Sequence, residues 1–259
     1  MPESAPAVAP SPALLAGRLS PEIIGKRIEQ LSQSSGLDEQ TRERAVALYR
    51  EAIDHLAAEA AWRAKAAEFE RLQAEAPALL ERVRRQAAAR KSELPLPASL
   101  ELAELEQQLA KSEAELAAAR QVQADLEQER KHRAERRAEV PRKLAEATQA
   151  LQELAARFAE GSPPPSAEPA LAEWVAAQAR RRALEAEVEA YRKEILSYDA
   201  RRELLAARLD QAAREVARLE ARVEKIRSAV TERRRLEAER RAREAKTTSE
   251  KVAGKHPVL

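Results

Sequence analysis

The hydrophobic positions along this chain recur three and four residues apart over most of its length. The pattern is strongest over residues 184–230, where the four-three alternation is uninterrupted, and it extends backward to Trp174. A heptad pattern of this kind is typical of a long helix that packs against a partner helix in a left-handed coiled coil. We call the apolar positions that face the partner the seam. In this helix they are Leu184, Val188, Tyr191, Ile195, Tyr198, Leu205, Leu209, Val216, Leu219, Val223 and Ile226.

A second heptad run begins near residue 102 and keeps one frame to Phe158. Its ends are apolar, whereas residues 128–139 in its middle are polar and are followed by Pro141. Either the helix continues there with a kink or two helices meet, and the preserved frame favours a kink or a very short junction. Because a short loop separates this run from the final helix, we expect the two to be antiparallel neighbours. Its predicted seam residues include Leu102, Leu105, Leu109 and Leu116.

Proline, glycine and serine divide the chain into segments. Residues 1–19 are rich in proline and alanine and predict a flexible lead-in, after which Ser20 and Pro21 provide a cap and a first helical residue. Pro77 lies inside an apolar run and should kink or break its helix near residue 76. We therefore expect a helical coiled-coil domain over residues 20–246, with breaks near 34–37, 77, 92–98, 141 and 161–166. Residues 247–259 have no helical period and predict a tail or a connection to a downstream region.

The composition agrees with this pattern. Charged residues make up 35% of the 259 residues and aromatic residues 3%, while alanine occupies 58 positions and glycine only 5. So few large apolar side chains do not suffice to fill a large single core, which argues against an ordinary globular domain. The sequence predicts an all-α fold of elongated antiparallel helical hairpins or coiled coil.

The sequence offers no constellation for catalysis or for binding a cofactor or metal. It contains no cysteine, its three histidines (His55, His132 and His256) are scattered, and its glycines form no phosphate-binding loop. We therefore predict no catalytic, cofactor-binding or metal-binding residues, and no enzyme activity. The net charge of +2 argues against a nucleic-acid partner, since glutamates interleave the arginine-rich runs 133–137 and 233–235. The same arginine-rich runs could instead contact another anionic surface, such as lipid headgroups or cell-wall polymer.

No uncharged apolar run approaches the roughly 18 residues of a membrane span. The first residues also lack the basic and apolar regions of a signal peptide, so the chain as written is expected to be soluble and untargeted.

The order of these segments resembles the porin-type periplasmic helical domain of large mechanosensitive channels of the MscS superfamily. The similarity covers roughly residues 20–257, and the placement of prolines between heptad blocks is its most discriminating part. The segments that carry it are 23–31 with 36–38 and 48–52, Glu75-Ala76-Pro77 within 72–80, the leucine-rich 100–116, Glu139-Val140-Pro141 with 144–147, 198–209 with 230–234, and His256-Pro257.

The resemblance implies a non-catalytic periplasmic extension with a structural or regulatory role in channel assembly or gating under osmotic stress. It also implies a homo-oligomer, heptameric in that superfamily, and a transmembrane channel region that this sequence does not contain. A stand-alone cytoplasmic coiled-coil scaffold or spacer is the alternative interpretation, and export from the cytoplasm distinguishes the two.

Overall fold

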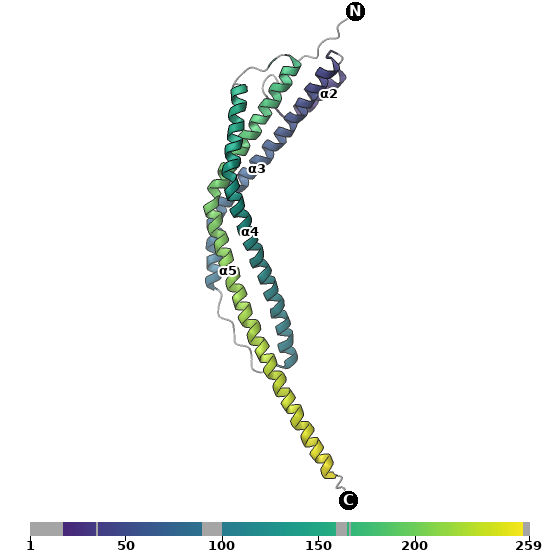
Figure 1. Cartoon of the computed structure of the whole chain (residues 1–259), viewed down its shortest axis with the longest axis vertical. Helices are drawn as coiled ribbons and strands as arrows, with labels where there is room; N and C mark the ends of the chain where they lie inside the picture. The colour runs from purple at the N-terminus through teal and green to yellow at the C-terminus, as the bar shows by residue number, and fades with distance from the viewer. Residues whose placement is uncertain (1–17, 35, 90–99, 159–164, 166, 256–259) are drawn as a thin grey trace, which may run out of the picture. The chain divides into compact units, whose positions relative to one another are not determined.

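The computed structural model describes residues 18–34, 36–89, 100–158, 165 and 167–255, with side chains as far as residue 251 (Figure 1). These residues form four helices: α2 (Pro21–Gln33), α3 (Glu39–Ala89), α4 (Leu102–Arg157) and α5 (Glu168–Lys255). None of the described residues forms a strand. The predicted all-α fold class is therefore confirmed.

The first two helices begin at side-chain caps. The Ser20 hydroxyl accepts a hydrogen bond of 3.3 Å from the backbone N–H of Ile23, and Pro21 occupies the first helical position. At the start of α3 the Asp38 carboxylate accepts a 3.0 Å hydrogen bond from the backbone N–H of Thr41, which lowers the pKa of Asp38. These caps satisfy backbone donors that the first helical turn leaves without partners.

At Pro77 and Pro141 the sequence left open a kink or a break, and the structure shows no break, because α3 and α4 each continue through their proline. A proline inside a helix cannot donate to the carbonyl four residues earlier, here that of Gln73 or Arg137. Both of those residues are exposed, so water can satisfy the carbonyls. Buried side chains flank the prolines, with Ala76 and Leu80 around Pro77 and Val140 and Ala147 around Pro141, and their packing offsets the lost hydrogen bond.

The end of the helical region also differs from the sequence expectation. Helix α5 does not stop near residue 246 but continues to Lys255. Residues such as threonine and serine near 247–249 have only a mild helix penalty, so a helix already nucleated can extend through them. The rest of the predicted tail (256–259), the lead-in over 1–17, the break near 92–98 and most of the loop at 161–166 lie outside the described residues.

The chain divides into two compact units, and the divisions fall within α3, α4 and α5. Unit 1 comprises residues 1–77 and 133–202. One core cluster in it joins α2, α3 and α5 through large side chains such as Ile24, Tyr49 and Leu171 and small ones such as Ala45 and Ala179. A second cluster packs Val140 and Ala147 of α4 against Val188 and Tyr191 of α5, with Trp62 of α3 at its side. The alanines let the helices approach closely.

Unit 2 comprises residues 78–132 and 203–259. Its core clusters lie between α4 and α5. Leu105 packs with Ile226 and Val230, whereas Leu116 packs with Val216, Leu219 and Val223. Since early residues of α4 meet late residues of α5, the two helices are antiparallel, as expected of a helical hairpin.

Candidate functional site: charged and aromatic contacts between helices

The predicted seam residues are distributed over both units and do not converge on one site. Of those in unit 1, Val188 and Tyr191 are buried and Leu184 and Tyr198 are partly buried. In unit 2, Leu102, Leu109 and Leu209 are partly buried. The buried seam residues of unit 2 are Leu105, Leu116, Leu205, Val216, Leu219, Val223 and Ile226.

One position departs from the predicted seam. Ile195 is 36% exposed and its neighbour Leu196 is 62% exposed, whereas Glu194 and Ser197 are buried. The interior face of α5 at this point is therefore shifted by one residue toward the N-terminus, and polar side chains occupy it. The physical reason is a polar network in which a side chain of α4 binds Glu194 of α5.

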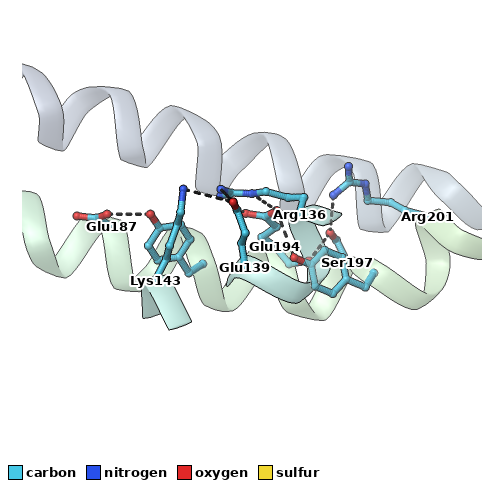
Figure 2. A network of polar contacts seen from close by, with 9 residues as sticks. Arg136, Glu139, Lys143, Glu187, Glu194, Ser197 and Arg201 are labelled. Carbon is cyan, nitrogen blue, oxygen red and sulfur yellow. Dashed lines mark hydrogen bonds and ion pairs between the residues drawn. The ribbon is translucent and has the colours of Figure 1, made fainter. Parts of the chain in front are cut away.

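The centre of this network is the ion pair between Arg136 of α4 and Glu194 of α5 (Figure 2). The Nε and Nη2 atoms of Arg136 each donate a 2.9 Å hydrogen bond, to Oε1 and Oε2 of Glu194 respectively. The Glu194 side chain is 3% exposed and that of Arg136 is 29% exposed. A planar guanidinium that holds both oxygens of a carboxylate fixes orientation as well as distance, so this pair sets how α4 lies along α5 in unit 1.

Further contacts extend the network along both helices. The Tyr198 hydroxyl donates to Glu194 Oε1 at 3.3 Å, and the Ser197 hydroxyl donates to the Glu194 backbone carbonyl at 2.7 Å. Arg201 in turn donates to the Ser197 hydroxyl at 3.3 Å. On α4, Figure 2 shows Lys143 reaching toward Glu139, with 3.5 Å between Nζ and Oε2. The buried side chains of Glu194 and Ser197 therefore both have partners, as the low-polarity interior requires.

Aromatic rings connect the same region to α3. The ring of Trp62 meets that of Tyr191 edge to face, with 5.2 Å between centroids. Lys65 lies over the Trp62 ring at 4.1 Å, and the Arg136 guanidinium lies over the Tyr191 ring at 5.6 Å. These geometries are typical of favourable aromatic and cation–π contacts, so three helices of unit 1 share one polar-aromatic junction.

The electrostatics of this junction favour the protonation states that the contacts need. The hydrogen bond to Glu194 raises the pKa of Arg136 despite partial burial, so the guanidinium remains charged. Burial, together with the Glu187 carboxylate that its hydroxyl contacts, raises the pKa of Tyr191 to about 12. Burial and Glu194 raise the pKa of Tyr198 to about 12 as well. Both phenols therefore stay neutral hydrogen-bond donors at neutral pH.

A second buried network joins α2, α3 and α5 near the start of α5. Arg27 of α2 forms an ion pair with Glu168, the first residue of α5, and donates to its Oε1 from Nε at 3.1 Å. The hydroxyl of Tyr49 on α3 donates to the same oxygen at 2.8 Å. Burial and the neighbouring carboxylate raise the pKa of Tyr49, and Glu168 raises that of Arg27 against the opposing effect of burial. The carboxylate also lies at a helix N-terminus, where negative charge is favoured.

Unit 2 has a regular ladder of surface ion pairs between α4 and α5. Glu106 pairs with Arg234 at 2.6 Å, Glu113 with Arg227 at 2.9 Å, and Arg120 with Glu220 at 2.7 Å. Each successive pair lies seven residues further along α4 and seven residues back along α5. Exposed pairs contribute little stability individually, but a heptad-spaced series disfavours every other register of the two helices.

None of these sites is arranged for catalysis or ligand coordination. The buried carboxylates Glu168 and Glu194 are each held by an arginine and a tyrosine. Within the described part of the chain, no group of three or more histidine, cysteine, aspartate or glutamate side chains could hold a metal ion. No helix among the described residues is long and apolar enough to cross a membrane. These contacts hold the helices in fixed positions against one another.

The apolar pattern of the sequence indicates none of these three sets of contacts, because it does not show which charged residues pair between helices. The seven-residue spacing of Glu106 and Glu113, matched by that of Arg227 and Arg234, was a usable signal for the ladder. Arg27 and Glu168 are 141 residues apart, and no pattern in the sequence connects them.

We predict that the two partners of the central ion pair are not equivalent. Replacing Arg136 with Met leaves the Glu194 carboxylate buried without its cation, which should cost about 3 kcal/mol of unit 1 stability. Replacing Glu194 with Met leaves a partly exposed arginine that can reach water, and should cost about 1–2 kcal/mol. Denaturant unfolding followed by tryptophan fluorescence measures this directly, because Trp62 and Trp174, the two tryptophans of the chain, both lie in unit 1.

The matched control for this pair is Arg142→Met, since Arg142 pairs with Glu146 at 3.0 Å on the surface of the same helix. Its loss should change stability by less than about 0.5 kcal/mol. Equal costs for the Arg136 and Arg142 variants would contradict the importance of the buried pair.

A second prediction concerns alkaline pH. Unfolded tyrosines lose their proton near pH 10, whereas Tyr191 and Tyr198 in the folded state hold it to about pH 12. Between these values the folded state binds more protons than the unfolded state. The free energy of unfolding therefore keeps its full value below pH 10 and falls as the pH rises toward 12. Tryptophan fluorescence melts at increasing pH should show this decline, with a shallower slope in a Tyr191→Phe/Tyr198→Phe variant. An identical slope in the variant would refute the assignment.

The comparison with known proteins agrees with this arrangement of long helices. The family model of the mechanosensitive ion channel porin domain matches residues 27–259, nearly the whole chain. No curated protein and no solved structure matches the chain. The match covers the segments on which the resemblance in the sequence rested, except residues 23–26, and includes both proline-containing helices. The chain therefore belongs to the mechanosensitive ion channel porin domain family.

Proposed function

We propose that this chain is a non-catalytic periplasmic helical extension of a mechanosensitive channel of the MscS type, with a structural or regulatory role in channel assembly or gating under osmotic stress. The observation that carries the proposal is the family match over residues 27–259. The family is associated with mechanosensitive channels, and the periplasmic side of the inner membrane is where such an extension would act.

The contacts between helices support a mechanical role over a chemical one. The bidentate pair of Arg136 with Glu194 and the buried pair of Arg27 with Glu168 tie α5 to α4 and to α2 within unit 1. The heptad-spaced ion pairs do the same for α4 and α5 within unit 2. Contacts of this kind resist sliding of one helix along another, which is the property that an extension needs if it is to transmit or resist force.

Three kinds of partner follow from this function. The first is the transmembrane, channel-forming region of such a protein, which the described helices do not include. The second is further copies of the same chain in a homo-oligomer. The third is the cell wall or the membrane surface, contacted by charged helix faces. We assign the seam residues to helix packing and assign no role to nucleic acid.

Fractionation of the source cells tests the proposal. An antibody raised to residues 184–230 should detect a band much larger than 28.8 kDa in the membrane fraction. The epitope should become sensitive to added protease when the outer membrane is permeabilised and the inner membrane is intact. A cytoplasmic protein of known location serves as the control for inner-membrane integrity. A band near 28.8 kDa in the soluble cytoplasm would contradict the proposal and leave the stand-alone scaffold.

A further inference from the structure

Beyond Arg234, whose pair with Glu106 belongs to the ladder between α4 and α5, the helix has no apolar core among the described residues to account for its structure. The last core cluster of unit 2 ends at Ile226 and Val230. Over residues 235–251 every side chain is exposed except that of Glu237, which is partly buried. Leu236 is the one large apolar side chain in this segment, and it is 46% exposed. Burial of an amphipathic face, the usual source of helix stability in proteins, is therefore lacking here.

Ion pairs along the helix surface take its place. Arg235 pairs with Glu232 at 2.8 Å and with Glu239 at 3.3 Å, and Glu239 also lies 3.9 Å from Arg243. These contacts form a continuous chain of charges over residues 232–243, with steps of three or four residues. Opposite charges at this spacing stabilise an isolated helix.

Two further pairs run beside this chain. Glu237 lies 3.7 Å from Arg241, and Arg240 lies 3.0 Å from Glu244. The hydrogen bond between Glu232 and Arg235 lowers the pKa of the glutamate and raises that of the arginine, so the pair is charged over a wide pH range. The segment contains neither glycine nor proline, and residues 232–246 consist of alanine, leucine, glutamate, arginine and lysine, which all favour helices.

The heptad frame explains why a partner helix is not expected. The frame that includes Ile226 and Val230 continues to Arg233, Glu237, Arg240, Glu244 and Thr247. A partner packed on these positions would bury no apolar surface and would remove charged groups from water. The cost of removing these charged groups from water would then oppose association. New ion pairs with the partner would have to replace the existing pairs along the helix.

We propose that residues 235–251 form a single α-helix that stays folded in water without a partner and acts as a rigid spacer. At 1.5 Å per residue these 17 residues span about 25 Å. This spacer function goes beyond the channel-associated role proposed above. It does not depend on that role, because it concerns only the mechanics of this helix in the chain itself. Its stability comes from charge patterning, so it should be sensitive to salt and to a change in the order of charges.

The test uses the full chain, which has no native cysteine and therefore accepts specific spin labels. A Ser228→Cys/Ser249→Cys variant places two labels on exposed positions about 31 Å apart along a continuous helix. Pulsed electron paramagnetic resonance, with labelled protein diluted in unlabelled protein, should give a narrow distance distribution near this value. A broad distribution would overturn the proposal. Its width is decisive, because a flexible chain of this length has a similar mean separation of about 25 Å.

Two charge-reversal variants distinguish the effect of the ion pairs on helix stability from a general effect of substitution. Glu239→Arg places three arginines at positions 235, 239 and 243 and should broaden the distribution markedly. Glu203→Arg makes the same exchange at an exposed position elsewhere on α5 and should leave it narrow. If the Glu239 variant is as narrow as the wild type, the ion-pair chain is not what holds the helix.

Label mobility tests the absence of a partner. Single labels at Thr247→Cys, on the heptad frame, and at Ser249→Cys, outside it, should be equally mobile in the full chain. Immobilisation of the label at 247 alone would reveal a partner helix and overturn the proposal. Because this readout concerns only the chain itself, it can fail or succeed independently of the cellular location of the protein.

Discussion

The structure depends on one constraint, which is that long helices packed through many small side chains bury little apolar surface per turn. Alanines such as Ala45, Ala52, Ala172 and Ala190 are fully buried where a globular core would have leucine or phenylalanine. Small side chains let helices approach closely, but they interlock weakly and allow neighbouring registers of similar energy. Something other than shape has to select one alignment of each helix pair.

Polar contacts make that selection. In unit 1 the buried carboxylates Glu168 and Glu194 each accept hydrogen bonds from an arginine and a tyrosine on other elements or turns, so a shift of register would leave a charge buried without its partner. In unit 2 the selection is made by repeated exposed pairs, each weak and all compatible with one register.

The sequence predicts the helices better than it predicts what joins them. Heptad periodicity and the caps at Ser20 and Asp38 depend on local spacing, and they specify the all-α fold and the antiparallel hairpin of α4 and α5. At Pro77 and Pro141 local propensity left a kink and a break open, and the helices continue through both prolines because buried side chains pack on either side. Glu194 was missed, and Ile195 was placed in the seam, because an apolar pattern cannot show where a paired charge is buried instead.

The most direct test of this account is a double-mutant cycle on Arg136 and Glu194, measured as the free energy of unfolding of unit 1 from tryptophan fluorescence. The account predicts a coupling energy of about 2 kcal/mol between the two side chains, so that the double variant is much less destabilised than the sum of the single variants. A coupling energy below about 0.3 kcal/mol would mean that the two residues act independently. That result would contradict the claim that buried ion pairs set the alignment of the helices.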